Sequence, residues 1–285
     1  MGKLGISLIN KISKIDTRRI IDKDDLTFMP RALVMATLPH SNPGNQILAW
    51  ERFAGNFRLL VRADPKFGMP YGSYPRLFAM WLTNEILRTK KRVLSLEGSY
   101  YAFLSALKLH TDGKTRRRFK GQVNALLASA ITLDRIDSGR FHREPVNISD
   151  TFDLWWDPKR PADETLWQTS ITLNEVFYNH VINHAVPLDI RIVNSLKKSP
   201  LALDLYAWMS YRYFYLKKET QISWSSLFHQ FGADYDRVLD FKKRLKTYLI
   251  AVHTAYPDAR FELVDRGLIL KPSRTSIPPK FLKLS

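Results

Sequence analysis

The stretch RRRFKGQVNALL at residues 116–127 and the stretch DFKKRLKTYL at residues 240–249 space their apolar side chains in the same way. When Phe119 is aligned with Phe241, apolar residues recur in both stretches at positions i, i+4, i+7 and i+8. This spacing turns one stripe of a helix into a core and leaves the cationic side chains facing outward. The sequence therefore predicts two amphipathic, cationic helices of one design, and with them two related units.

In the first unit, the cationic helix is expected at about residues 115–130, after helices at residues 73–92 and 99–109. Paired strands are expected at residues 131–137 and 145–156, on either side of a polar turn. Ser73 is the expected N-cap of the first helix. Three helices followed by a hairpin are the parts of a winged helix.

The second unit repeats this order of elements. A long helix is expected from residue 199, a short helix capped by Ser225, and a cationic helix capped by Asp234 or Asp236. Strands at residues 260–264 and 268–271 flank an Asp-Arg-Gly turn, which predicts a hairpin and hence a second wing. The predicted fold class is therefore α+β and helix-rich, with two tandem winged-helix domains, each a helix-turn-helix with a β-hairpin wing.

The breaks in this pattern predict the domain organisation, and Pro187 marks the expected boundary between the units. We expect a basic N-terminal segment at residues 1–27, an N-terminal winged-helix domain at 28–186, a C-terminal winged-helix domain at 187–272 and a flexible tail at 273–285. The apolar and aromatic residues between positions 150 and 172 could belong to the core or to a homodimer interface, and we expect the core. These residues are Phe152, Trp155, Trp156, Trp167 and Ile171.

The composition points to a polyanionic partner. The 285 residues are 45% hydrophobic and carry a formal net charge of +17, an excess that favours nucleic acid or an anionic membrane surface. The absence of cysteine excludes disulfides and cysteine zinc sites and fits a reducing compartment. No apolar run approaches the ~20 residues that span a bilayer, so we expect a cytoplasmic protein without a membrane partner.

Motifs of enzymes are present only in part. The GKT at residues 113–115 resembles the end of a phosphate-binding loop, but the chain has Lys108 where that loop needs glycine. His180 and His184 have the spacing of a zinc helix, yet Val181 stands where the metalloprotease version has glutamate. No two histidines are separated by a single residue, as a rolling-circle nickase would require. We therefore expect no enzymatic activity, no metal and no cofactor.

Several phrases in order also resemble the plasmid RepA-type replication initiators. They are TLPHSNP at 37–43, PYGSYPRL at 70–77, WQTSITL at 167–173, VPLD at 186–189, SPLALDLY at 199–206 and FHQFG at 228–232. The resemblance runs from about residue 28 to residue 279. It implies an initiator that binds repeated double-stranded sites at a plasmid origin, recruits the host's helicase-loading or initiator proteins, and represses its own promoter. It also implies an exchange between monomers that bind the repeats and dimers that repress.

The side chains facing away from the apolar stripes are the candidates for DNA contact. On a helical wheel, Arg117 and Arg118 lie opposite Val123, and Lys243 lies opposite Leu245. Arginine reads guanine, asparagine and glutamine read adenine, and lysine binds phosphate or guanine. The predicted DNA-contacting residues are Arg116, Arg117, Arg118, Lys120, Gln122 and Asn124 in the first helix, Arg237, Lys242, Lys243, Arg244, Lys246 and Thr247 in the second, and Arg266 and Arg140 in the wings.

Three alternatives remain open on the sequence alone. The chain could be a winged-helix transcription repressor without initiator activity, which would bind an operator only. It could be a basic protein that binds nucleic acid or a membrane surface without sequence preference, with strong salt dependence. Each cationic cluster could also be a solvated helix face, but two equivalent clusters in a chain of this charge favour DNA.

Overall fold

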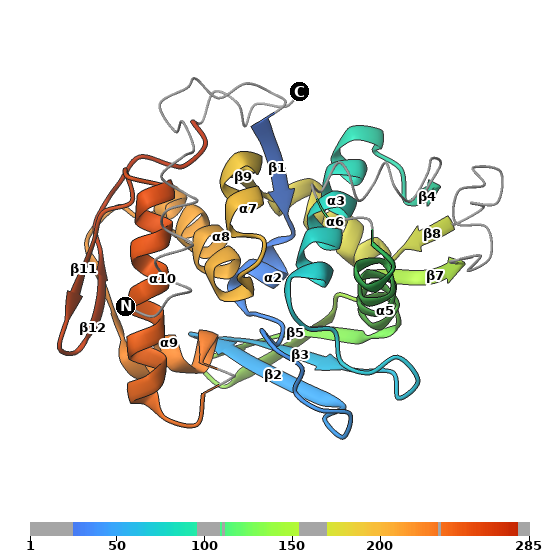
Figure 1. The fold of residues 1–285 in the computed structure, drawn as a ribbon, viewed down its shortest axis with the longest axis horizontal. Coiled ribbons are helices and arrows are strands. Elements are labelled where there is room, and N and C mark those ends of the chain that lie inside the picture. Colours follow the sequence, from blue (N-terminus) through green and yellow to red (C-terminus); the bar gives the residue numbers. More distant parts are fainter. Residues whose placement is uncertain (1–24, 96–108, 110–111, 154–169, 233–234, 279–285) are drawn as a thin grey trace.

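The computed structural model describes residues 25–95, 109, 112–153, 170–232 and 235–278 of the chain. Helices and short antiparallel strands make up this part of the chain, so the predicted α+β class is confirmed. Figure 1 shows the two predicted cationic helices far apart along the long axis of the molecule. They are α5 (Gly113–Ala128), towards the right, and α10 (Val238–Ala255), towards the left.

Around α5, a long helix and three strands form one unit. The carboxylate of Asp112 caps α5 by accepting a hydrogen bond from the Thr115 backbone N–H at 2.9 Å. The three strands form one sheet in which the first strand pairs with the third, and the third with the second. The surrounding elements are α3 (Ser73–Thr89), β4 (Val93–Ser95), β7 (Ser149–Asp153) and β8 (Ser170–Leu173).

Around α10, a second unit repeats this arrangement. Ser199 caps its long helix, and Pro200 occupies the first helical position, where the missing N–H has no cost. The sheet order is β10-β12-β11, so here too the first strand pairs with the third and the third with the second. The internal repeat indicated by the sequence therefore extends to strand order. The elements are α8 (Pro200–Tyr215), β10 (Thr220–Ser223), α9 (Trp224–Phe231), β11 (Phe261–Val264) and β12 (Gly267–Leu270).

The hairpin expected after α5 is placed differently from the prediction. β5 (Ala130–Asp137) pairs with β6 (Arg140–Pro145), whereas residues 149–153 form β7 in another sheet. The β5–β6 hairpin extends a four-stranded sheet in the order β2-β3-β5-β6, with β2 (Ala49–Ala54) and β3 (Phe57–Arg62). Apolar residues of β3 and β5 lie opposite each other, which explains why β5 joins this sheet.

A buried carboxylate holds this sheet together. Asp134 of β5 is fully buried and lies between Arg58 of β3 and Arg143 of β6, its partners in the strand register. Arg58 approaches it to 2.6 Å and Arg143 to 2.8 Å. The hydrogen bonds from Arg143 are the largest cause that lowers the pKa of Asp134, and Arg58 acts in the same direction against the effect of burial. The pairing leaves the carboxylate charged in the interior.

The remaining elements connect the two units. Near the start of the described chain, β1 (Leu26–Met29) pairs with β9 (Val186–Asp189), so that Pro187 lies within a strand opposite Phe28. One continuous hydrophobic core contains residues from both units. The predicted division at residue 187 stays a prediction. The other connecting elements are α2 (Arg31–Met35), α6 (Glu175–His184) and α7 (Ile190–Leu196).

Three predicted helix starts need correction. Ser73 is the first residue of α3, and Gly72 precedes it as the N-cap. Ser223, and not Ser225, caps α9 by accepting a hydrogen bond from the Ser226 backbone N–H at 3.1 Å. No side chain caps α10, whose N-cap residue is Arg237 and not Asp236. Apart from the alternative at Asp234, each start lies within two residues of the prediction, which is the usual uncertainty of helix ends.

Several predictions concern parts of the chain outside the described residues. These are the basic segment up to residue 24, most of the helix expected at residues 99–109, Asp234, and the three tryptophans between residues 154 and 169. Of the two other aromatic-region residues, Ile171 is fully buried and Phe152 is half-buried against the core. Both observations agree with the expected core role.

Gly267 at the start of β12 carries a prediction for stability. A Cβ atom at this position would lie 1.9 Å from the carbonyl oxygen of Ile222 in β10. We expect Gly267→Ala to lower the free energy of unfolding by about 2 kcal/mol, because the strands must separate. Urea denaturation would measure this. Gly121→Ala is the control, because its Cβ meets nothing within 4 Å and the helix gains propensity; equal midpoints for both variants would contradict the prediction.

Candidate nucleic-acid interface

The α5 helix exposes part of the predicted cationic face. Phe119, Val123 and the two leucines at 126 and 127 are buried, which confirms the predicted stripe. Arg117 and Arg118 are exposed, and neither has a carboxylate partner among the described residues. The exposed face of α5 therefore presents two guanidinium groups that form no ion pair with the described residues.

The other four candidates on α5 are already engaged or partly buried. Arg116 and Lys120 are half-buried and each has an interaction partner, and burial lowers the pKa of Lys120. The side-chain oxygen of Gln122 accepts a hydrogen bond of 2.6 Å from the Tyr71 backbone N–H. Asn124 is half-buried, and its side-chain oxygen has no donor among the described residues. Within this helix, the structure thus favours Arg117 and Arg118 over the others.

The α10 helix exposes two lysines on one face. Lys243 and Lys246 are exposed, and neither has a carboxylate partner in the described part of the chain. Lys242 lies at the edge of this face, with its ammonium nitrogen 5.1 Å from the centre of the Trp224 ring. Arg244 stacks over the Tyr248 ring on the other flank, at 5.5 Å. The aromatic rings hold these two cations beside the exposed lysines.

The first turn of α10 differs from the prediction. Val238 extends the apolar stripe one turn before Phe241 in the sequence, but 40% of it is exposed, and the helix begins at this residue. Arg237 forms an ion pair of 2.7 Å with Asp240, and the hydrogen bond from Arg237 is the main cause that lowers the pKa of Asp240. Thr247 donates a hydrogen bond of 3.3 Å to the Lys243 carbonyl. Arg237 and Thr247 thus have partners within the helix.

The two arginines predicted at wing tips lie in different surroundings. Arg266 is exposed in the two-residue turn between β11 and β12, as predicted. Arg140 is exposed at the start of β6 and therefore belongs to the four-stranded sheet, not to the sheet of the first unit. Of these two hairpins, β11–β12, which carries Arg266, belongs to the three-stranded sheet beside the cationic helix α10, whereas β5–β6 belongs to the four-stranded sheet.

A groove runs beside α5, and its far side belongs to the second unit. It holds about 940 Å³ and lies between the exposed face of α5 and the turn that joins α7 to α8. The turn contributes Lys197 and Lys198, which the sequence reasoning missed. The signal was present as two adjacent lysines directly before the Ser-Pro start of a helix. The groove places cations from both units on one surface.

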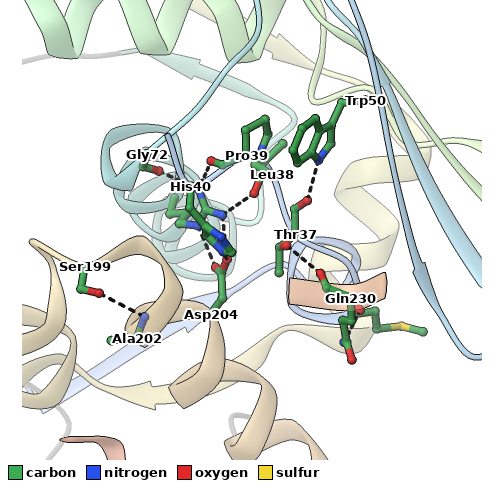
Figure 2. Close-up of polar contacts among 12 residues, drawn as sticks. Thr37, Leu38, Pro39, His40, Trp50, Gly72, Ser199, Ala202, Asp204 and Gln230 are labelled. Carbon is green, nitrogen blue, oxygen red and sulfur yellow. Dashed lines mark hydrogen bonds and ion pairs between the residues drawn. The ribbon is translucent and has the colours of Figure 1, made fainter. Parts of the chain in front are cut away.

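Below this groove, a buried ion pair joins the two units. Arg76 of α3 and Asp204 of α8 are 1% and 2% exposed. Two nitrogens of the guanidinium each approach one carboxylate oxygen to 2.7 Å. The Nε2 atom of His40 lies 2.9 Å from the same carboxylate, as Figure 2 shows for His40 and Asp204. Burial raises the pKa of the Asp204 carboxyl, but Arg76 and His40 outweigh burial and hold that pKa below its ordinary value.

Backbone carbonyl groups accept the remaining hydrogen bonds of the Arg76 guanidinium. The Arg76 guanidinium also donates to the carbonyl oxygens of Gly72 and Leu38 at 2.7 Å, and of Pro39 at 3.2 Å. Beside it, the Thr37 hydroxyl donates to the Gln230 carbonyl at 3.1 Å, which ties in α9 (Figure 2). Buried charge is tolerated only with this degree of pairing. Four of the six phrases that carry the family resemblance therefore meet here, at residues 37–43, 70–77, 199–206 and 228–232.

The described residues contain neither a metal-ligating cluster nor a membrane-spanning helix. They contain no group of three or more histidine and acidic side chains placed to hold a metal ion. His180 lies 2.9 Å from Glu144, which gives it a partner in the sheet. None of the helices in the described ranges is both long enough and apolar enough to cross a bilayer.

The fold is similar to that of one solved structure, and a second structure matches at a lower score. A crystal structure of selenomethionine derivatives of domains 2 and 3 of RctB matches with a TM-score of 0.53 and 9% sequence identity, covering 83% of this chain and 95% of that chain. A second crystal structure of RctB domains 2–3 gives a TM-score of 0.48 and 11% identity, covering 77% and 82%. At these identities the likeness concerns the fold alone.

The family comparison covers the middle of the chain. The comparison with curated proteins found no match. The family described as plasmid-encoded RepA protein matches residues 69–226, which is more than half of the chain. The match contains Arg76, Asp204 and both sides of the cationic groove, together with all of α5. The chain therefore belongs to the family of plasmid-encoded RepA proteins and is a RepA-type plasmid replication protein.

Proposed function

We propose that this protein initiates plasmid replication by binding repeated double-stranded sites at the origin through α5 and α10. The observation that carries the proposal is the repeat itself: two helices of one design, each beside a sheet of the same strand order, expose unpaired cations. A chain in which each of two similar units binds one half-site is suited to a repeated DNA sequence. The net charge of +17 supports a polyanionic partner.

Each unit, on this proposal, is a winged helix. The second unit has the order expected of that motif, with α8, α9 and α10 followed by the β11–β12 hairpin. In the first unit, the strands that correspond to this hairpin are β7 and β8, since they occupy the same places in the sheet order as β11 and β12. The wing that we expected at residues 131–137 and 145–156 is therefore reassigned to β7–β8.

The proposed contacts divide into base reading and phosphate binding. Arg117 and Arg118 of α5, and Lys243 and Lys246 of α10, would enter successive major grooves, where arginine and lysine bind guanine edges. Lys242 and Arg244 would bind phosphates from the flanks of α10, and Arg266 would do so from the wing. The protein acts by binding, without catalysis or a cofactor of its own. It would recruit the host's helicase-loading or initiator proteins and repress its own promoter.

Competition binding tests this function. Labelled DNA from beside the gene would be titrated with the protein in an excess of unlabelled random duplex, at several salt concentrations. We expect retention on a discrete repeated site with a preference of ~10³-fold or more over random DNA. Equal competition by random duplex would overturn the proposal and leave a non-specific polyanion-binding protein. A plasmid-maintenance assay then separates initiation from repression alone, since a repressor would bind the site without supporting replication.

A further inference from the structure

We infer that the groove between α5 and the α7–α8 turn is a binding site for a phosphate group of the DNA backbone. The inference rests on the proposed DNA binding and deepens it. It assigns a contact outside the two cationic helices, made by lysines that belong to the second unit. The duplex bound by α5 would in this way be contacted by both units at once.

The charge of the groove is the first observation. Arg117 and Arg118 reach it from α5, and Lys197 and Lys198 reach it from the turn. Arg117, Arg118 and Lys198 have no carboxylate partner among the described residues, and no aspartate or glutamate is among those that line the groove. Cations that repel one another and lack counter-charges are stabilised when an anion lies between them.

The backbone geometry of the groove is the second observation. Two long helices begin at its wall, α3 at Gly72–Tyr74 and α8 at Pro200. No side chain caps α3 and Pro75 has no N–H, so among the described residues the N–H groups of Ser73 and Tyr74 are left for another acceptor. The N-terminal ends of helices carry partial positive charge and bind phosphate through these N–H groups. Both helix ends therefore attract an anion into the groove, as the four cationic side chains do.

His40 provides the third observation, and it is independent of the other two. Its side chain is only 7% exposed and lines the groove. The Nε2 atom is occupied by Asp204, whereas the Nδ1 atom is buried and has no hydrogen-bond partner among the described residues. A buried polar atom without a partner is costly. When Nε2–H donates to Asp204, Nδ1 is an acceptor, so a water held in the groove would donate one hydrogen bond to Nδ1 and another to a phosphate oxygen.

Gly121 adds a steric condition. It lies on the exposed face of α5, lines the groove, and has open space around the position of a Cβ atom. Glycine within a helix costs ~1 kcal/mol relative to alanine. Here it keeps the groove open on the side of α5, so that a sugar-phosphate chain can approach the helix backbone.

The test replaces the lysines of the turn in the full-length protein. We expect Lys197→Ala with Lys198→Ala to weaken binding about tenfold, equally for origin repeats and random duplex, because phosphate contacts carry no sequence information. The slope of log affinity against log salt should become shallower by about one to two, since each phosphate contact contributes ~0.9. The matched control is Lys217→Ala with Lys218→Ala, an adjacent lysine pair beyond the other end of α8 that should leave both quantities unchanged.

A second variant guards against a misfolded double mutant. Gly121→Gln should stabilise α5 by up to ~1 kcal/mol and yet weaken DNA binding, because its side chain would occupy the groove.

A third experiment distinguishes free phosphate from a phosphate of the DNA backbone. Inorganic phosphate at constant ionic strength would be added during thermal unfolding of the parent protein and of the K197A/K198A protein. A rise in Tm of the parent alone, together with unchanged DNA affinity of the variant, would assign the groove to free phosphate and overturn our inference.

The outcomes separate this inference from the proposed function. If the parent and the K197A/K198A protein bind origin DNA with equal affinity and equal salt slope, the inference is wrong and the proposed function stands. If the variant loses affinity for the repeats but not for random duplex, the lysines read bases and the inference is also wrong. If the parent protein shows no preference for any DNA site, the proposed function fails. If the variant and the parent then also have the same salt slope, the groove does not bind a DNA phosphate either.

Discussion

Replacing Asp204 by Asn is expected to lower the free energy of unfolding by about 3 to 5 kcal/mol. The change leaves the Arg76 guanidinium, which is 1% exposed, in the interior without its counter-charge. Arginine does not lose its proton in proteins, so the buried charge would persist at any accessible pH. Urea denaturation of the full-length protein measures the effect. The matched control is Glu85→Gln, which removes the carboxylate from an exposed pair with Arg88 and should change the midpoint little.

The converse variant, Arg76→Met, adds a pH signature to this prediction. In the parent protein the Asp204 pKa is lowered on folding, so its contribution is present above about pH 4, the unfolded value, and is lost as pH falls through the folded pKa. Without Arg76, burial would instead raise that pKa. The R76M protein should therefore be least stable at neutral and higher pH and recover as the carboxyl takes up a proton. A D204N midpoint equal to that of the parent would show that the cluster does not stabilise the fold.

Replacing Lys243 and Lys246 by Ala together should weaken binding to the origin repeats by about a hundredfold. Both lysines are exposed on α10 and have no carboxylate partner in the described chain, so the fold should stay intact. Gel-shift titration measures the affinity, and circular dichroism with urea denaturation checks the fold. Lys217→Ala with Lys218→Ala again serves as the control. Unchanged affinity of a folded K243A/K246A protein would show that α10 does not enter the DNA.

The sequence could predict what depends on local periodicity. The buried stripes of α5 and α10 follow from side chains three and four residues apart, and their apolar positions are buried except for the half-buried Tyr248 and the exposed Val238. The β11–β12 hairpin follows from its turn residues. These features are decided within a few residues of the chain, which is the range over which a single sequence can be interpreted.

Features that depend on distant pairing were beyond the sequence. The strands β5 and β7 both follow α5, and only their partners, β3 and β8, distinguish them. β3 lies far earlier in the chain than β5, and β8 follows β7 only after residues 154–169. Arg76 and Asp204 stood in quoted phrases, but their contact joins residues 128 positions apart. Lys198 and Arg118 line one groove although 80 positions separate them, and no local pattern predicts that they share it.

The buried link between Arg76 and Asp204, within one continuous core, has a consequence for the DNA itself. In the proposed function, two DNA-contacting helices that are joined through one core bind half-sites at a fixed separation. Flexibly tethered modules would instead accept a range of separations. Each base pair inserted between two half-sites rotates one half-site relative to the other about the duplex axis by roughly a tenth of a turn. Binding should then depend on the rotational phase of the half-sites, so that the spacing of the repeats at an origin is set by the interior of the protein.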